Sequence, residues 1–183
     1  MLYTRKGDEG DTSIFACDQR LSKSSKIAEA LGALDEVNSF LGVCKMKSVG
    51  SGIAIGDESL VDVLYNVQQN LFIVQAEVAG AEKTISEDKV KEIEIIVDSI
   101  EKELPKISSF FVSGGTELTA SIDFARTLAR KAERRVVASS EEGILKVGKH
   151  TLAYLNRLSS ILYALARFVN LKRGIKEQPP TYK

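Results

Sequence analysis

A cluster of basic side chains in one short segment is the first feature of this sequence that could do chemistry. Glu133 is the only acid among five basic residues within ten positions: Arg126, Arg130, Lys131, Arg134 and Arg135. On a helix, Arg126, Arg130 and Glu133 would follow one stripe, where they could line a groove and hold an anion. A solvated basic face that pairs with carboxylates of a neighbouring helix explains the same pattern, and both interpretations stay open.

The segment T-R-K-G-D-E-G-D-T-S at 4–13 offers a second set of groups suited to an anion. Gly7 and Gly10 free backbone N–H groups, and hydroxyls and a cation surround them, which is the chemistry that a phosphate chain requires. The segment is not a Walker A loop, because that loop needs G-x-x-x-x-G-K-S/T between a strand and a helix. A flexible polar terminus is the alternative interpretation.

Asn156, within Y-L-N-R-L-S at 154–159, is a further candidate ligand, because the leucines beside it point to the core and leave it near a groove edge. Its amide could bind phosphate or a metal-bound water, or it could simply be solvated. His150 is the only histidine, which argues against the paired Glu-x-x-His sites of di-iron bundles. No Cys/His or Ser/His pairing indicates a catalytic triad.

Helices must position these groups, because apolar residues recur at three- and four-residue steps in five separate stripes. The stripes span residues 27–44, 60–78, 90–104, 118–136 and 155–169. Pro105 ends the third stripe, and Ser86 followed by Glu87 and Asp88 is expected to start its helix. Since no segment alternates with period two for long enough to build a sheet, we predict an all-α fold, a five-helix bundle with ferritin-like up-down packing.

The length of 183 residues indicates a single domain. We divide it into an N-terminal arm at 1–25, a helical bundle at 26–172 and a tail at 173–183. The arm is unlike a bundle helix, and it is either a long ordered extension or a disordered tail.

Charge and hydropathy exclude several classes of protein. Lys plus Arg equals Asp plus Glu at 25 each, so no global field attracts nucleic acid or an anionic membrane. The N-terminus has no apolar h-region and no uncharged apolar stretch approaches about eighteen residues, so we expect neither a signal peptide nor a membrane span. Cys17 and Cys44 make no disulfide framework or zinc cluster, and a reducing cytoplasm fits best.

Five blocks of the sequence together resemble the ATP:cob(I)alamin adenosyltransferases of the PduO type. They are Y-T-R-K-G-D-E-G-D-T at 3–12, G-A-L-D-E-V-N-S at 32–39, the segment 110–115, A-R-T-L-A-R-K-A-E-R-R at 125–135 and Y-L-N-R-L-S at 154–159. The blocks stand in the order typical of that family and cover almost the whole chain. The resemblance implies a five-helix bundle assembled as a homotrimer, with ATP at subunit interfaces and a corrinoid in a neighbouring pocket.

By this resemblance the N-terminal arm becomes an ATP clamp. The residues implied to bind ATP are Thr4, Arg5, Gly7, Asp8, Gly10, Asp11, Thr12, Ser13, Lys23, Arg130, Lys131, Glu133, Arg134 and Asn156. Arg130 and Lys23 would stabilise the triphosphate together with Mg²⁺, and Asp35 would pair with Arg126 across the subunit boundary. Phe110 would occupy the lower face of the corrin and exclude an axial ligand; its alternative role is that of a core residue.

The implied reaction is a nucleophilic substitution in which Co(I) attacks the 5′ carbon of ATP and triphosphate leaves. Since cobalt of the substrate is the nucleophile, the protein need only position the reactants and stabilise the leaving charge. Cobalamin is the implied second substrate, and a flavoprotein reductase and a cobalamin-dependent acceptor enzyme are implied partners. A non-catalytic nucleotide- or corrinoid-binding bundle and a ferritin-like carboxylate metalloprotein are the competing hypotheses.

The sequence departs from the family pattern in several places. Ser113 stands where proline is usual, Ala33 where threonine is common, and Asp123 where histidine often precedes the arginine block. Aspartates are usual at three further positions, Ser24, Ser25 and Ser160. We therefore expect the corrinoid contacts to differ from the family more than the ATP contacts. The missing Walker A sequence also separates this chain from the P-loop adenosyltransferases, which perform the same reaction on another fold.

Overall fold

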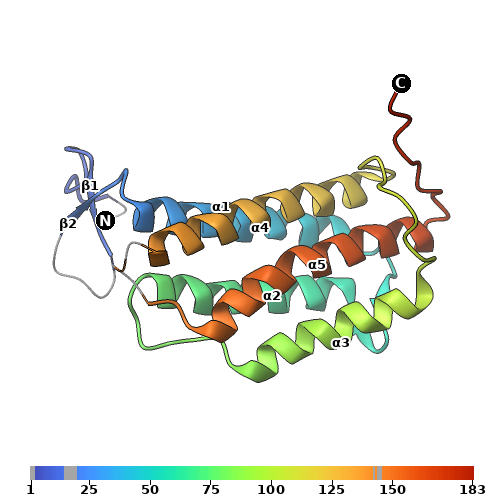
Figure 1. Ribbon diagram of the computed structural model, residues 1–183, viewed down its shortest axis with the longest axis horizontal. Helices are drawn as coiled ribbons and strands as arrows, with labels where there is room; N and C mark the ends of the chain where they lie inside the picture. Colours follow the sequence, from blue (N-terminus) through green and yellow to red (C-terminus); the bar gives the residue numbers. More distant parts are fainter. Residues whose placement is uncertain (1–2, 15–19, 142, 144–145) are drawn as a thin grey trace.

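Long helices form the body of the computed structural model, which describes residues 3–14, 20–141, 143 and 146–183. The helices in that part of the chain are α1 (Lys26–Ser48), α2 (Leu60–Val78), α3 (Glu87–Glu103), α4 (Glu117–Glu141) and α5 (Lys149–Lys172). Helix α1 packs against α2 and α4, α4 packs against α5, and α5 packs against α3 (Figure 1). The predicted five-helix bundle is confirmed.

The core of the bundle consists of the predicted apolar stripes. Leu34, Leu64, Ile122 and Leu158 are fully buried where the helices face one another. Burial of one such side chain contributes about 1.5–3 kcal/mol, so the helices owe most of their stability to this packing. Helix α5 begins earlier than its leucine stripe because its first turns also bury Thr151 and other inward-facing residues.

The ends of α3 show which terminal signals were predicted correctly. The helix ends at Glu103, just before Pro105, as the proline predicts. Ser86 occupies the N-cap position with extended backbone but makes no side-chain cap hydrogen bond. The predicted cap is therefore only partly correct, and Glu87 and Asp88 supply the charge that favours a helix N-terminus.

Within the described residues, two short antiparallel strand pairs interrupt the helical architecture. Strand β1 (Asp11–Ser13) pairs with β2 (Arg20–Ser22), and β3 (Ala54–Ile55) pairs with β4 (Glu58–Ser59). Neither pair carries a core of its own. The β1–β2 pair folds the N-terminal arm into a hairpin, so its described residues are an ordered extension rather than a disordered tail; Cys17 lies outside the described residues.

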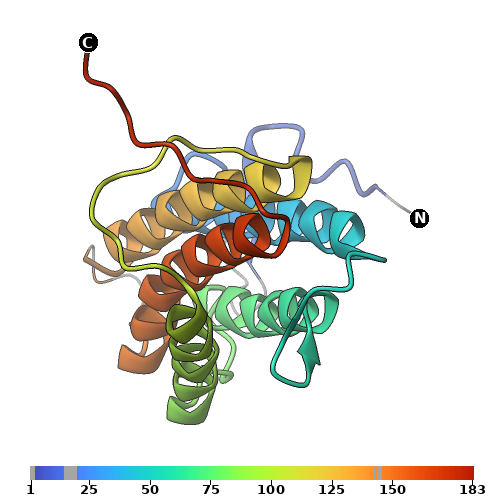
Figure 2. The same cartoon turned by 90° about the vertical axis from the view of Figure 1, so that its right-hand side faces the viewer.

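The irregular parts of the chain lie at opposite ends of the bundle. The β1–β2 hairpin lies beside the start of α1, whereas the loop from α3 to α4 and the C-terminal segment 173–183 lie at the other end (Figure 1). Figure 2 views the bundle from this second end, where the loop and the C-terminal segment run over the helices. Over the described residues, no helix combines the length and apolarity needed to cross a membrane.

Candidate functional site

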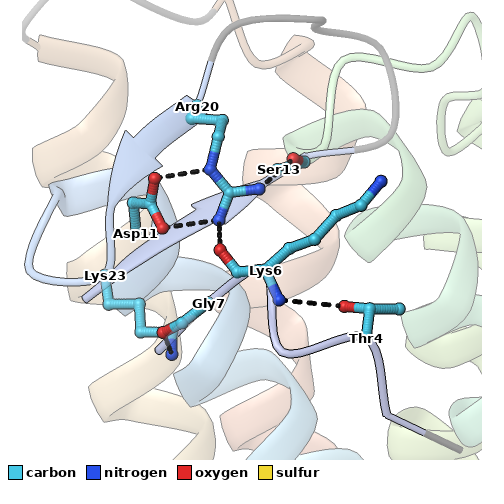
Figure 3. Close-up of polar contacts among 7 residues, drawn as sticks. All are labelled: Thr4, Lys6, Gly7, Asp11, Ser13, Arg20 and Lys23. Carbon is cyan, nitrogen blue, oxygen red and sulfur yellow. Dashed lines mark hydrogen bonds and ion pairs between the residues drawn. The ribbon is translucent and has the colours of Figure 1, made fainter. Parts of the chain in front are cut away.

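Arg20, which the sequence analysis did not single out, organises the N-terminal arm. Its Nε and Nη2 atoms each lie 2.5 Å from a carboxylate oxygen of Asp11, and Nη2 also donates to the carbonyl oxygen of Lys6 (Figure 3). Its Nη1 atom reaches Ser13 Oγ at 3.5 Å. The hydrogen bond from Arg20 lowers the pKa of the Asp11 carboxyl. Asp11 is therefore held ionised inside the hairpin, where it shapes the arm.

Lys23 fastens the turn that contains Gly7 and Gly10. Its Nζ atom donates to the carbonyl oxygen of Gly7 at 2.6 Å (Figure 3). Its backbone N–H donates to the carbonyl oxygen of Gly10 at 2.9 Å. A Cβ at Gly7 would lie 3.1 Å from the backbone carbonyl oxygen of Asp11, and Gly10 has a φ of +85°, so each position favours glycine. The side chain of Lys23 is exposed beside a cavity of about 380 Å³ lined by Thr12, Ser13, Ile14, Lys23, Ala28, Leu31 and Ala79.

The remaining predicted arm residues lie in the turn before β1. The backbone N–H of Lys6 donates to Thr4 Oγ1 at 3.4 Å, and that of Asp8 donates to the carbonyl oxygen of Arg5 at 3.3 Å. Arg5 has a φ of 60°, an uncommon conformation for a side-chain-bearing residue. Its guanidinium lies 5.5 Å from the centroid of the Tyr3 ring. The side chains of Thr4, Arg5 and Asp8 are all exposed and accessible to a ligand.

Two of the basic residues of α4 pair with carboxylates of the neighbouring helix α1. Lys131 Nζ lies 2.6 Å from Glu36 Oε2, and Arg135 Nη1 lies 3.1 Å from Glu29 Oε2. These two residues agree with the interpretation of the basic segment as a charged face that pairs with carboxylates of the neighbouring helix. Lys131 is already engaged in this ion pair, and its binding of ATP stays a prediction.

Arg130 and Arg134 behave differently. Both are exposed, and neither forms a hydrogen bond or ion pair with another of the described residues. They stand four residues apart on α4, a spacing at which like charges repel each other on a helix surface. A bound anion would relieve that repulsion. This pair is therefore the part of the basic segment that favours a ligand site.

Glu133 and Asn156 meet where α4 and α5 pack together. Asn156 Nδ2 donates to Glu133 Oε1 at 3.1 Å, and Asn156 Oδ1 accepts from Arg157 Nη1 at 2.8 Å. Arg157 Nε is in turn 2.9 Å from Glu94 Oε1. This network fixes the orientation of the Asn156 amide, and it places a carboxylate three residues from Arg130 on the same helix.

A cavity of about 670 Å³ opens beside the loop that joins α3 to α4. Its walls are Ile107, Ser108, Ser109, Phe110, Phe111, Ser113, Asp123, Arg126, Arg130, Ser159, Ser160 and Tyr163. Phe110 is 79% exposed at this cavity, so the alternative that it is a core residue is wrong. The cavity combines aromatic and aliphatic walls with a basic edge, and its size is typical of small-molecule sites.

Two of the departures from the family pattern, Ser113 and Asp123, contact each other at this cavity. Burial disfavours ionisation of Asp123, but hydrogen bonds from Arg126 and Ser113 outweigh it and lower the pKa of the carboxyl. Arg126 Nε lies 2.7 Å from Asp123 Oδ1 within the same chain. Asp35 is exposed on α1, and its pairing with Arg126 across a subunit boundary stays a prediction.

Comparison with known proteins places the chain in a family. The family model described as cobalamin adenosyltransferase matches residues 2–169. This chain belongs to the cobalamin adenosyltransferase family. The corrinoid adenosyltransferase PduO of Salmonella typhimurium is 38% identical over an alignment of 173 residues that covers 91% of this chain and 48% of that protein. The corrinoid adenosyltransferase of Bacillus subtilis is 36% identical over an alignment of 180 residues that covers 95% of this chain and 89% of that protein.

The solved structures that resemble this family member agree in fold. A phenylalanine-to-alanine variant of the PduO-type ATP:corrinoid adenosyltransferase from Lactobacillus reuteri, complexed with cobalamin and ATP, superposes with a TM-score of 0.86 at 28% identity over 99% of each chain. An arginine-to-lysine variant of the same protein, complexed with ATP, gives a TM-score of 0.84. The chain spans about half the length of the PduO proteins of Salmonella typhimurium and Citrobacter freundii.

One chain of this family member does not bring all the predicted site residues together. Lys23 precedes α1 by a few residues, and Phe110 belongs to the loop between α3 and α4. The start of α1 and this loop lie at opposite ends of the bundle (Figure 1). Arg130 stands midway along α4, a helix of 25 residues that is about 37 Å long at 1.5 Å per residue. The arm and the cavity are therefore separate within a chain.

Proposed function

We propose that the protein transfers the 5′-deoxyadenosyl group of ATP to Co(I) of a corrinoid, which forms adenosylcobalamin and releases triphosphate. The observation that carries this proposal is the position of Arg130. It has no partner among the described residues and stands at the edge of a 670 Å³ cavity with aromatic walls. The cation suits the phosphates of ATP, and the aromatic walls suit a large, flat macrocycle. The names of the relatives and the cobalamin and ATP in a solved relative support the same reaction.

In this reaction the electron pair of Co(I) forms the cobalt–carbon bond, and the bond from the 5′ carbon to the triphosphate oxygen breaks. The leaving group carries the developing negative charge, which Arg130 and Arg134 would stabilise from α4. The protein needs no nucleophile of its own, since its contribution is to position the two substrates and meet that charge. A protein that binds only one of the two substrates, or does not bring them together, would correspond to the non-catalytic alternative.

The separation of the arm from the cavity that Arg130 lines supports a site shared between copies of the chain. Lys23 and the glycine turn would cover the phosphates bound to Arg130 of a neighbouring copy, in a homotrimer whose interface includes Asp35 and Arg126. Such sharing lets both cationic groups act on one triphosphate although they lie in different parts of one chain. The arm carries backbone donors, hydroxyls and a cation, as a phosphate-binding segment should.

Mg²⁺ would accompany the phosphates of ATP. Among the residues that the structure describes, no three His, Cys, Asp or Glu side chains are grouped to hold a metal ion. Mg²⁺ is commonly bound by one or two carboxylates together with substrate phosphates, and Glu133 beside Arg130 fits that requirement. When bound, the ion would supply further positive charge at the triphosphate.

Phe110 would cover the lower face of the corrin and exclude an axial ligand of cobalt, which makes Co(II) easier to reduce. An exposed aromatic ring at the cavity suits this role, because an apolar side chain offers cobalt no donor atom. We propose that a flavoprotein reductase supplies the electron that converts Co(II) to Co(I). A cobalamin-dependent acceptor enzyme would take the product, and the cytoplasm is the proposed location.

The proposed reaction is tested with chemically reduced cob(I)alamin and ATP under anaerobic conditions. We expect a light-sensitive cobalt–carbon product and one triphosphate per product. Replacement Arg130→Gln should lower kcat/KM for ATP by about ten- to a hundredfold, the equivalent of one charge-assisted phosphate contact. The control Arg135→Gln should have little effect, because Arg135 already pairs with Glu29. Tight binding of both ligands without a cobalt–carbon product would establish the non-catalytic alternative.

A shared site makes a separate prediction about mixtures. Lys23→Ala and Arg130→Ala proteins should each be impaired, and mixing them under conditions of subunit exchange should restore part of the activity. The restored activity would come from subunit interfaces at which the intact arm of one copy meets the intact α4 of another. Sedimentation of the unmodified protein should show a trimer. If the mixture stays inactive although subunits are shown to exchange, or if the unmodified protein sediments as a monomer, the site is not shared.

A further inference from the structure

The C-terminal segment 173–183 is fastened to the loop that carries Phe110. The backbone N–H of Val112 donates to the carbonyl oxygen of Gln178 at 2.8 Å, although these residues lie far apart in the sequence. The loop belongs to neither α3 nor α4, and the segment follows the end of α5. Figures 1 and 2 show both at the same end of the bundle.

A buried arginine of α5 contacts both the loop and the C-terminal segment. Arg167 is only 5% exposed. Its Nε atom lies 3.0 and 3.1 Å from the two carboxylate oxygens of Glu177, and its Nη2 lies 2.9 Å from Glu177 Oε2. The same Nη2 donates to the carbonyl oxygen of Pro105 at 3.1 Å. One guanidinium thus holds the start of the loop and the C-terminal segment at once.

The aromatic residues around Arg167 connect it to the large cavity. Its guanidinium lies 5.1 Å from the centroid of the Phe111 ring and 5.9 Å from that of Tyr163. Phe111 and Tyr163 both line the cavity, and Phe111 is the immediate neighbour of Phe110. A displacement of Arg167 would therefore reach the cavity wall directly.

The far end of the loop has its own attachment to α5. Asn170 Nδ2 donates to the carbonyl oxygen of Gly114 at 3.2 Å, and Asn170 Oδ1 accepts from Thr119 Oγ1 at 2.9 Å. A Cβ at Gly115 would collide with Asn170 Oδ1, and the φ of +121° at this position disfavours a side chain. The loop is therefore held to α5 at both ends, and the Arg167 attachment joins it to the C-terminal segment through the side chain of Glu177.

We propose that Arg167 and Glu177 are positioning residues of the corrinoid site, and that the C-terminal segment is thereby a working part of that site. This inference rests on the proposed function, in which Phe110 contacts the corrin. A buried guanidinium must keep its carboxylate partner, because an unpaired charge in the interior is costly. The pair therefore keeps the loop in one arrangement before a substrate binds, with Phe110 presented to the cavity.

The first test measures the loop without any substrate. Replacement Glu177→Gln removes the charge with almost no change of shape, and the side chain lies near the surface at 15% exposure. We expect backbone amides of residues 106–115, Val112 above all, to exchange hydrogen at least about tenfold faster. The control Glu103→Gln breaks the 2.6 Å pair with Lys172 at the same end of the bundle and should leave loop exchange unchanged. Unchanged exchange at Val112 in Glu177→Gln would overturn the proposal.

The second test separates a positioning role from a merely structural one. In Glu177→Gln the KM for the corrinoid should rise by about tenfold or more, while the KM for ATP stays constant, because misplaced groups act on the substrate they face. Glu177→Asp, which keeps the charge, should recover part of the loss. Faster loop exchange with an unchanged KM for the corrinoid would overturn the positioning role. If the unmodified protein forms no adenosylcobalamin, the proposed function itself fails, and the exchange experiment still decides whether the pair holds the loop.

Discussion

At each end of the bundle an arginine fastens irregular chain to a carboxylate, but the two pairs are placed in different surroundings. The side chains of Arg20 and Asp11 in the arm are 35% and 34% exposed, whereas those of Arg167 and Glu177 are 5% and 15% exposed. Water and salt screen an exposed pair, so it adds little to folding stability. A buried pair loses much more when one partner is removed.

The difference in burial indicates how each end meets its ligand. The arm is held by contacts among its own residues and by few apolar groups, so it is able to change shape when a nucleotide or a second copy arrives. The loop between α3 and α4 is held by the bundle itself through Arg167 and Asn170, so its shape is set before a corrinoid binds. We therefore expect removal of the arginine to lower stability at the loop end and to weaken nucleotide binding at the arm end.

Replacement Arg167→Ala should have the largest effect on stability. It removes the ion pair with Glu177, the hydrogen bond to Pro105 and the contact with the Phe111 ring. We expect a loss of about 3–5 kcal/mol in the free energy of unfolding, measured by urea denaturation. A loss as small as that of an ordinary surface variant would show that the loop end is no more firmly held than the arm.

Phe110→Ala should affect reaction rates and leave stability almost unchanged, because the ring is 79% exposed. Covering a phenylalanine with the corrin is worth about 1.5–3 kcal/mol, so the rate from cob(II)alamin should fall by about ten- to a hundredfold. The rate from chemically pre-reduced cob(I)alamin should fall much less, since the lost step is reduction. Equal losses from both oxidation states would assign Phe110 to binding alone.

The bundle was predictable from the sequence because its signal repeats. Apolar residues at three- and four-residue steps leave few alternatives to a helix, and Pro105 marks the end of α3 with one residue. The ionic contacts at both ends were not predictable in the same way. Arg20 and Asp11 face each other only because the β1–β2 pairing places Arg20 opposite Ser13, and a three-residue strand has no detectable period.

The candidate site was predicted in part, and the limits have a physical cause. The spacing of α4 predicted one basic stripe, but only the positions of Glu29 and Glu36 on α1 decide which cations are neutralised and which remain for an anion. Arg167 was hidden inside the apolar α5, where a charged residue offers no periodic signal. Its partner Glu177 lies ten residues later in a segment without regular structure.

Arg20→Ala tests the arm end of the bundle. We expect no measurable change in melting temperature, because the exposed pair with Asp11 is screened by water. The KM for ATP should nevertheless rise severalfold, since the carbonyl oxygen of Lys6 beside the glycine turn loses its hydrogen bond from Arg20 and the arm must be ordered when the nucleotide binds. The KM for the corrinoid should stay constant. A marked loss of stability would show that the arm is as firmly integrated into the fold as the loop.

The smallest effect is expected from Asp123→Asn, which tests how the folding stability of the loop end depends on pH. The pKa of Asp123 in the folded protein lies below its ordinary value of 3.8, because hydrogen bonds from Arg126 and Ser113 outweigh the cost of burial. Asp123 therefore stabilises the fold above pH 3.8, and this contribution is lost as the pH falls through the lowered pKa. We expect Asp123→Asn to lower the free energy of unfolding at neutral pH by less than about 1 kcal/mol, because the pair with Arg126 is partly exposed to solvent. Urea denaturation at several pH values should show the two proteins converging in acid. A difference that grows as the pH falls would mean that the carboxyl is protonated more readily in the folded state, and that burial, rather than Arg126, controls its ionisation.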